Sequence, residues 1–222
     1  MAMIEVKEKK LVDFSFIPSL KCNLSCKHCM YNSSPYNPGV LNLEKTKKFV
    51  STIDYSKINA MGFYGGEISY DYEAYQRIID LVQKKAIKFT ITNGTWSVDE
   101  RETQKFIDFI NKNELKVFIS DTKFHRPFQN ESLLKRIAVE QGFSIKEEDD
   151  IIPMGRASKN DWGCSEKCGK YFLPMRLTLN TKGEIMFLNC DGRYPVIGNY
   201  NENFDHILSK GLKAREYCEK RK

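Results

Sequence analysis

The sequence has 222 residues, of which 41% are hydrophobic and 29% are charged, with a formal net charge of +6. This composition excludes a disordered chain and fits one large domain, or one domain with a small appendage. Since no apolar run approaches the length of a membrane span and the basic stretches 7–10 and 210–222 lie at the two ends, neither a membrane protein nor a nucleic-acid surface is indicated.

Residues 12–153 alternate short β-rich runs with amphipathic helical stretches. Asp71 and Asp99 are placed to cap the N-termini of two helices, and a third helix begins near Asn130. Alternating strands and helices are typical of βα units around a parallel sheet, so the sequence predicts an α/β fold. The predicted strands are 12–17, 58–64, 87–92, 115–120, 143–145 and 151–153.

The number of these units predicts the architecture. Five or six βα units are too few for a closed eight-stranded barrel, so we expect a partial (β/α)6 barrel that resembles a TIM barrel. After residue 155 the pattern changes to a cysteine-bearing loop and two β-rich runs, 176–179 and 184–188. Gly183 suits the turn position between them that needs a positive φ, so we expect a hairpin. We therefore predict a core domain at 1–155 and a small cysteine-bearing hairpin module at 156–222.

Seven cysteines form two groups and one isolated position. The first group follows the first predicted strand, and the second surrounds the predicted hairpin. The chain starts without the apolar core of a secretory signal, and an odd number of cysteines does not suggest a disulfide framework. We therefore expect a cytoplasmic protein whose cysteines bind metal. The cysteines are Cys22, Cys26, Cys29, Cys164, Cys168, Cys190 and Cys218.

The first group offers three thiolates to one site at the end of a strand, where parallel βα folds place their chemistry. Cysteine thiolates hold iron–sulfur clusters, commonly one to each iron, so Cys22, Cys26 and Cys29 would leave one iron open for a ligand. The alternative is a structural zinc site that adds His28 or a distant ligand. Because His28 is adjacent to Cys29, it joins a tetrahedral site with difficulty, and we favour the cluster.

The spacing C-x3-C-x2-C resembles the signature of the radical S-adenosylmethionine (SAM) superfamily, over about residues 11–155. This resemblance implies a [4Fe-4S] cluster that binds SAM. His28 stands where the family usually has an aromatic residue beside the adenine of SAM. Gly65, Gly66 and Glu67 end the second predicted strand, and the resemblance implies that Glu67 binds the amino group of SAM. The alternative is an ordinary strand-to-helix turn.

Polar residues at the ends of later strands complete the predicted site. Asn93 and Ser120 resemble positions that contact SAM in relatives, although turn chemistry also explains Asn93. Arg156 resembles a Gly-Arg element that could pair with the carboxylate of SAM, or it is a surface residue. We expect Asp121 and His125 to be catalytic residues that touch SAM or substrate. Their alternatives are a turn cap and an exposed loop residue.

The second cysteine group resembles the SPASM or twitch extension of radical SAM enzymes, which carries an auxiliary Fe–S cluster. Cys164, Cys168 and Cys190 would supply three ligands, and Cys218 is a possible fourth. The spacing from Gly183 to Cys190 is longer than usual, and the later cysteine-rich segment of full SPASM domains is missing. A zinc site and unligated thiols therefore stay open for this group.

The resemblance implies a function as well as a cofactor. A radical SAM enzyme cleaves SAM reductively to a 5′-deoxyadenosyl radical, which abstracts hydrogen from a substrate. We expect a peptide substrate, as for the maturases of ribosomally synthesised peptides (RiPPs), and an electron donor such as flavodoxin or ferredoxin. The alternatives are a radical SAM enzyme that acts on a small molecule or nucleotide, and a zinc-braced binding module without catalysis.

Overall fold

The computed structural model describes residues 12–147, 155–157, 175–187 and 195–219. Their strands form one open sheet in the order β5-β4-β3-β2-β1-β6-β7-β8. The pairs formed among β1 to β6 are parallel, whereas the pairs β6–β7 and β7–β8 at one end of the sheet are antiparallel. The expected α/β fold with an open, partial barrel is confirmed. The strands are β1 (Val12–Ser19), β2 (Ile58–Gly65), β3 (Lys88–Thr92), β4 (Leu115–Ser120), β5 (Ser144–Lys146), β6 (Met175–Leu179), β7 (Glu184–Phe187) and β8 (Val196–Asn199).

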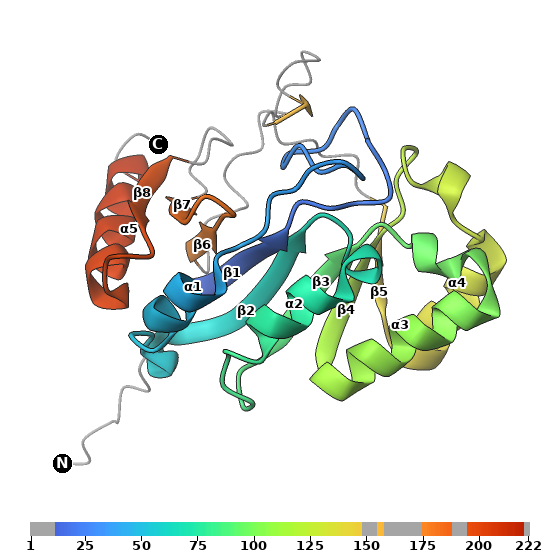
Figure 1. Ribbon diagram of the computed structural model, residues 1–222, viewed down its shortest axis with the longest axis horizontal. Helices are drawn as coiled ribbons and strands as arrows, with labels where there is room; N and C mark the ends of the chain where they lie inside the picture. Colours follow the sequence, from blue (N-terminus) through green and yellow to red (C-terminus); the bar gives the residue numbers. More distant parts are fainter. Residues whose placement is uncertain (1–11, 148–154, 158–174, 188–194, 220–222) are drawn as a thin grey trace.

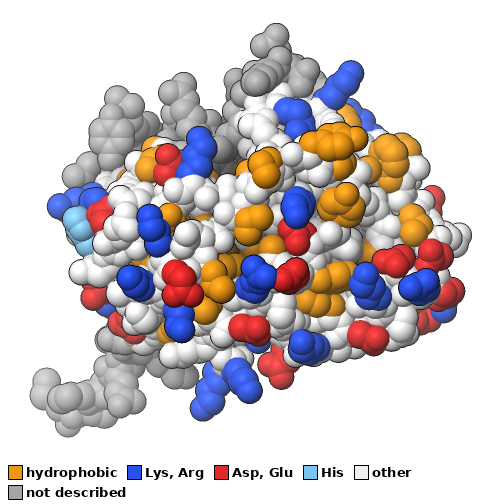
Figure 2. Space-filling model, viewed as in Figure 1, with side chains coloured by type: hydrophobic (Ala, Val, Ile, Leu, Met, Phe, Trp, Pro, Cys, Tyr) orange, Lys and Arg blue, Asp and Glu red, His pale blue; other side chains and the backbone are white. Residues whose placement is uncertain are grey.

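In the described ranges, five α-helices pack on one face of the sheet, most of them in front of it in Figure 1. Successive side chains of a strand point to opposite faces, so Phe14 and Phe16 of β1 face the helices while Ser15 faces away. The helix-facing side chains form one core with those of the helices. Figure 2 shows this side of the molecule, where acidic and basic side chains are interspersed. The helices are α1 (Leu43–Val50), α2 (Tyr72–Ile79), α3 (Glu100–Asn113), α4 (Glu131–Gln141) and α5 (Phe204–Glu219).

Two of the three predicted helix starts are capped as expected. Asp99 accepts a hydrogen bond from the backbone N–H of Glu102 at 2.9 Å, and Asn130 caps α4 in the same way. Asp71 does not cap α2, so that prediction is wrong. Its carboxylate instead accepts a hydrogen bond from the hydroxyl of Ser19, at 2.6 Å, because this buried hydroxyl at the end of β1 competes for it.

The predicted hairpin is confirmed by the antiparallel pair β6 and β7, with Gly183 at a φ of +83° in the turn. β6 also pairs with β1, so the hairpin continues the main sheet, and the domain boundary at residue 155 stays a prediction. The predicted strand 151–153 lies outside the described residues. The helices α1 and α5 and the strand β8 were not predicted. In the ranges given above, no helix has the length and apolar character needed to span a bilayer.

Candidate active site

The segment 20–42 between β1 and α1 carries Cys22, Cys26 and Cys29, and we call it the cysteine loop. It borders a cavity of about 350 Å³ at the carboxyl ends of the parallel strands. Most residues predicted for the site line this cavity, and Asp121 does not. Cys164, Cys168 and Cys190 lie outside the described residues, as does the side chain of Cys218. The predicted residues in the cavity wall are Cys22, Cys26, His28, Cys29, Gly65, Gly66, Glu67, Asn93, Ser120, His125 and Arg156.

Two of the three thiols accept hydrogen bonds from backbone N–H groups. The N–H of Leu24 lies 3.4 Å from Cys22 Sγ, and the N–H of Ser33 lies 3.3 Å from Cys29 Sγ. Burial raises the pKa of the Cys22 thiol to about 12 and that of Cys26 to about 11. With these pKa values, the free thiols of Cys22 and Cys26 are neutral at physiological pH. Bound iron would reverse this, since a coordinated thiol is deprotonated outright.

The spacing of these thiols bears on the kind of metal group that they fit. Among the residues that the structure describes, no three His, Cys, Asp or Glu side chains converge closely enough to hold one metal ion. A tetrahedral zinc ion would need its sulfur ligands about 3.8 Å apart. A four-iron cluster separates its ligands more widely, because each thiolate binds a different iron. Three thiols around one cavity, with N–H donors to two of the sulfurs, fit a cluster.

Gly65, the last residue of β2, and Gly66 let the end of this strand contact the cysteine loop directly. Gly66 donates its N–H to Ser19 O at 2.8 Å, and Glu67 donates its N–H to Lys21 O at 2.9 Å. A Cβ on Gly66 would lie 1.7 Å from Lys21 O, and Gly65 has a φ of +125°. The motif therefore supports the backbone that leads into Cys22.

Glu67 is 1% exposed and joins the ends of β2 and β3. One carboxylate oxygen accepts hydrogen bonds from Thr92 Oγ1 at 2.7 Å and from Ser69 Oγ at 2.8 Å, and the other accepts from the N–H of Asn93 at 2.8 Å. Burial raises the pKa of Glu67, and these donors oppose the rise. Glu67 thus borders the cavity and also fastens the strands that support it.

Asn93 extends this network to the first cysteine. Its Nδ2 lies 3.7 Å from Cys22 Sγ and donates to Asn23 Oδ1 at 3.1 Å, while its Oδ1 accepts from the N–H of Thr95 at 3.0 Å. The bond from Thr95 is the turn interaction that the sequence suggested for Asn93. Asn93 also contacts the thiol of Cys22. The sequence did not predict this contact.

Arg156 forms hydrogen bonds with three backbone carbonyls of the cysteine loop. Its guanidinium donates to Cys26 O at 2.8 Å and to Ser33 O at 2.5 Å, and its backbone N–H donates to Cys29 O at 3.0 Å. The preceding Gly155 has a φ of +56°, and a Cβ there would lie 2.6 Å from Met30 O. Arg156 is therefore no isolated surface residue, because it fixes the carbonyls of the loop that carries the thiols.

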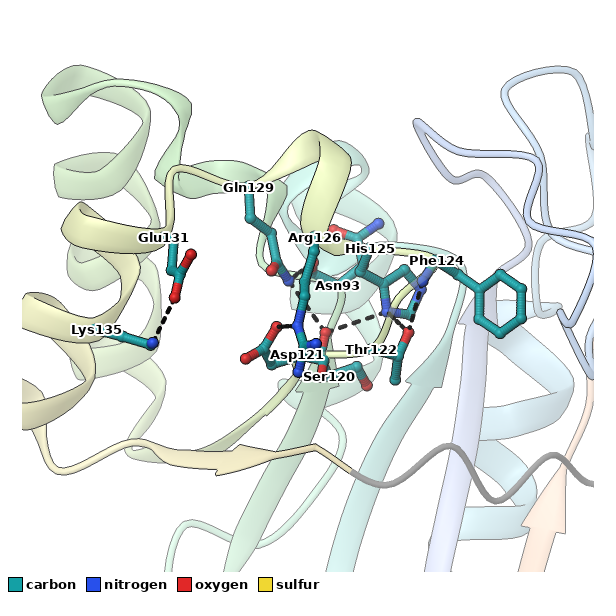
Figure 3. Close-up of polar contacts among 10 residues, drawn as sticks. All are labelled: Asn93, Ser120, Asp121, Thr122, Phe124, His125, Arg126, Gln129, Glu131 and Lys135. Atoms are coloured by element: carbon teal, nitrogen blue, oxygen red, sulfur yellow. Dashed lines mark hydrogen bonds and ion pairs between the residues drawn. The ribbon is translucent and has the colours of Figure 1, made fainter.

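The loop after β4 brings one predicted catalytic residue into the cavity wall (Figure 3). His125 Nδ1 lies 3.1 Å from Ser120 O and 3.2 Å from Thr122 Oγ1. Since a carbonyl oxygen only accepts, Nδ1 carries a proton and Nε2 is the acceptor of the neutral ring. Burial lowers the pKa of His125. Its ring centroid lies 5.0 Å from that of His28, which in turn stacks on Phe124 at 4.1 Å.

Asp121 lies in the same loop but does not line the cavity. Its carboxylate, 8% exposed, accepts a hydrogen bond from Arg126 Nε at 2.8 Å, as Figure 3 shows. The structure therefore brings His125, but not Asp121, to the cavity. A catalytic role for either stays a prediction.

Sequence reasoning missed one part of the cavity wall, which we call the floor and define as Ser15, Arg176 and Thr178. These side chains come from β1 and β6, on the sheet face opposite the helices. They were missed because β1 and β6 pair across more than 150 residues of sequence. The alternation of β1, with Ser15 between two phenylalanines, was the available signal.

Comparison with known proteins gives the family. Residues 16–143 match the family described as "4Fe-4S single cluster domain". YydG of Bacillus subtilis (strain 168), assigned to peptide biosynthesis, is 29% identical over 120 residues, which cover 53% of this chain and 38% of YydG. The antilisterial bacteriocin subtilosin biosynthesis protein AlbA, from the same strain, is 37% identical over 76 residues, which cover 34% of this chain and 17% of AlbA. The chain thus spans less than half the length of either relative.

Solved structures agree on the fold. BtrN in complex with AdoMet and 2-DOIA superposes with a TM-score of 0.61 at 12% identity, covering 96% of this chain and 88% of BtrN. Native anSMEcpe with bound AdoMet gives a TM-score of 0.55 at 14% identity, covering 91% and 83% of the two chains. At such identities these likenesses show the fold alone. With the family match covering more than half of the chain, the chain belongs to the 4Fe-4S single cluster domain family.

Proposed function

We propose that this protein is a radical SAM peptide maturase in which Cys22, Cys26 and Cys29 hold a [4Fe-4S] cluster whose open iron binds SAM. The observation that carries the proposal is that all three thiols open into one cavity, at the carboxyl ends of the parallel strands. Three cysteines leave one iron of a four-iron cluster without a protein ligand. The cavity of about 350 Å³ supplies room for a ligand beside the thiols.

The chemistry supplied by the bound cluster and SAM is electron transfer into the sulfonium, which releases methionine and a 5′-deoxyadenosyl radical that takes hydrogen from the substrate. The chain's own residues bind and orient the reactants. Glu67 would accept a hydrogen bond from the ammonium of SAM through its less occupied oxygen, and His28 would lie against the adenine. Ser120 and His125 present polar groups to the same cavity, and Asn93 and Arg156 hold the loop.

A peptide substrate is supported by the two curated relatives, since one is assigned to peptide biosynthesis and the other to subtilosin biosynthesis. We further propose that flavodoxin or ferredoxin supplies the electron. For the second cysteine group we propose an auxiliary Fe–S cluster on Cys164, Cys168 and Cys190, with Cys218 as a fourth ligand. An iron content near eight rather than four per reconstituted chain would support that cluster.

The test of the proposed function is formation of 5′-deoxyadenosine. Anaerobically reconstituted protein with SAM and dithionite should form it, and Cys26→Ala should not, because two thiolates hold a four-iron cluster poorly. Ser25→Ala, at the exposed neighbouring position, is the matched control and should keep the wild-type rate. If Cys26→Ala equalled the control in rate and iron content, the cluster assignment would be wrong. Circular dichroism checks that both variants fold.

A further inference from the structure

The floor of the cavity presents polar groups in a regular arrangement. In the parallel register of β1 and β6, Ser15 pairs with Thr178 and Asp13 pairs with Arg176. All four side chains therefore share the sheet face that the helices do not cover. Ser15, Arg176 and Thr178 line the same cavity as the thiols, so a molecule in that cavity can reach them.

The polar groups of the floor form no hydrogen bond or ion pair with the described residues. Ser15 and Thr178 are each 3% exposed, yet neither hydroxyl forms a hydrogen bond with a described residue. The exposed guanidinium of Arg176 likewise forms no hydrogen bond or ion pair there. The residues are buried, but their hydroxyls border the cavity, where a bound molecule can supply the missing hydrogen bonds. Two such hydroxyls beside a guanidinium, all three without a partner among the described residues, point to a ligand.

The space above these groups is kept open by a glycine. A Cβ on Gly62 of β2 would lie 2.5 Å from Ser15 Oγ and 2.8 Å from the ring of Tyr64. Any larger side chain at position 62 would therefore cover the hydroxyl. Gly62 leaves Ser15 reachable from the cavity.

The charged groups near the floor indicate which kind of ligand it suits. Asp13 lies close enough to Arg176 for their charges to interact, but its carboxylate accepts a hydrogen bond from Asn59 Nδ2 at 2.8 Å instead of forming an ion pair. The floor therefore offers one guanidinium that has no ion pair among the described residues, with a nearby carboxylate that weakens its field. It suits a single negative charge, such as a carboxylate, better than a dianionic phosphate, and guanidinium binds carboxylate in a planar, bidentate manner.

The position of the floor separates this ligand from SAM. Ser15 lies four residues before Ser19, where β1 ends and the cysteine loop begins, which places the floor about 13 Å from that end along the strand. The methionine carboxylate of SAM would be bound at the open iron, at the cysteine end. The ligand of the floor therefore belongs to the second reactant.

We propose that Arg176, Ser15 and Thr178 form a subsite that binds a carboxylate of the substrate peptide, from either an acidic side chain or the C-terminus. The inference rests on the proposed function for the peptide nature of the substrate. Arg176 supplies the charge, and the two hydroxyls donate hydrogen bonds to the carboxylate oxygens. Binding here would fix which part of the peptide lies near SAM.

The test uses reconstituted protein with SAM and three N-acetylated tripeptides as probes: acetyl-alanyl-glutamyl-alanine amide, its glutaminyl counterpart, and acetyl-trialanine with a free C-terminus. Dissociation constants come from ligand-observed NMR. The glutamyl or the free-acid peptide should bind about tenfold more tightly than the neutral one, and Arg176→Gln should abolish the difference. Whichever of the two binds more tightly identifies the source of the carboxylate. Arg101→Gln, which removes an exposed arginine on α3, should keep the preference.

Two outcomes would overturn the subsite: equal binding of the three peptides by the wild type, or a preference that survives in Arg176→Gln. Arg176 is exposed, so its variant should fold, and Ser15→Ala gives a second variant that should weaken the preference. The formation of 5′-deoxyadenosine in the same samples separates the two hypotheses. A protein that cleaves SAM but shows no carboxylate preference contradicts the subsite alone, whereas absence of cleavage in the wild type contradicts the proposed function.

Discussion

The two ends of the cavity differ in how their polar groups are satisfied. At the rim, defined as the cysteine loop with Gly66, Glu67 and Arg156, the carboxylate and guanidinium groups are engaged by protein donors and acceptors. At the floor, the hydroxyls and guanidinium have no partner among the described residues. The rim therefore resembles a rigid support for a cofactor, and the floor resembles a surface kept ready for an exchangeable ligand.

The largest expected effect is at Gly66. In Gly66→Ala the new Cβ would clash with Lys21 O, so the two hydrogen bonds to β1 and the cysteine loop must break. We expect the free energy of unfolding of the cluster-free protein to fall by about 3 kcal/mol, measured by urea denaturation. The control is Gly142→Ala, where φ is +67° but no atom lies within 4 Å of the Cβ, and where the loss should be about 1 kcal/mol. Equal losses would mean that the close approach is unimportant.

Glu67→Ala should lower the free energy of unfolding by about 2 kcal/mol, because it leaves buried donors of Ser69, Thr92 and Asn93 without an acceptor. If Glu67 also binds SAM, the dissociation constant of SAM, measured by equilibrium dialysis, should rise at least about tenfold. Glu73→Ala, on the exposed side of α2, should change neither quantity appreciably. An unchanged SAM affinity together with lost stability would restrict Glu67 to fastening the strands.

Arg156→Gln should loosen the cysteine loop without unfolding the protein. It removes the charged donor to Cys26 O and Ser33 O, so the cluster should lose iron to a chelator about tenfold faster. The measurement is the decay of the cluster's visible absorbance under anaerobic conditions. The surface variant Arg101→Gln should decay at the wild-type rate. The same rate of absorbance decay for both variants would show that the hydrogen bonds of Arg156 do not stabilise the cluster.

His125 predicts a dependence of stability on pH. Burial lowers its pKa below the unfolded value of 6.5, so its contribution is fully present above that pH and is lost as the pH falls. Between pH 7 and 5, the cluster-free wild type should lose about 1 kcal/mol more stability than His125→Gln. His206→Gln, which changes an exposed histidine of α5, should follow the wild type. Parallel pH profiles for His125→Gln and wild type would place His125 in a solvated position.

The smallest effect is expected at the floor. Thr178→Val replaces a hydroxyl that has no partner among the described residues with a methyl group of similar size, so the free energy of unfolding should change by less than about 0.5 kcal/mol. Thr90→Val is the matched control, because that buried hydroxyl donates to Phe63 O at 2.8 Å and its loss should cost about 1 kcal/mol. Equal losses in urea denaturation would mean that the hydroxyl of Thr178 stabilises the fold as that of Thr90 does, and so is not reserved for a ligand.

The sequence predicted where the site lies better than how it is held. Glu67, Asn93 and Ser120 could be grouped because the carboxyl ends of parallel strands meet at one edge of a sheet. The hydrogen bond from Arg156 to Cys26 O could not be predicted, since the two residues are 130 positions apart in the sequence. The carboxylate of Asp71 looked like a helix cap because local rules cannot anticipate a buried hydroxyl from β1. The apolar spacing of Phe204, Ile207 and Leu208 was available to predict α5 and was overlooked.

The pairing of β1 with β6 has a consequence for how the protein is made. Val12 pairs with Met175, so one edge of the strand that leads into the cysteine motif stays open until about 160 further residues have left the ribosome. Long-range parallel pairing is slow, and an open strand edge invites aggregation during that interval. The thiols, by contrast, are synthesised early and acquire their support from β2 before the sheet is complete. We therefore expect the yield of native protein to be limited by the arrival of β6, and coexpressed chaperones to raise it more than added iron does.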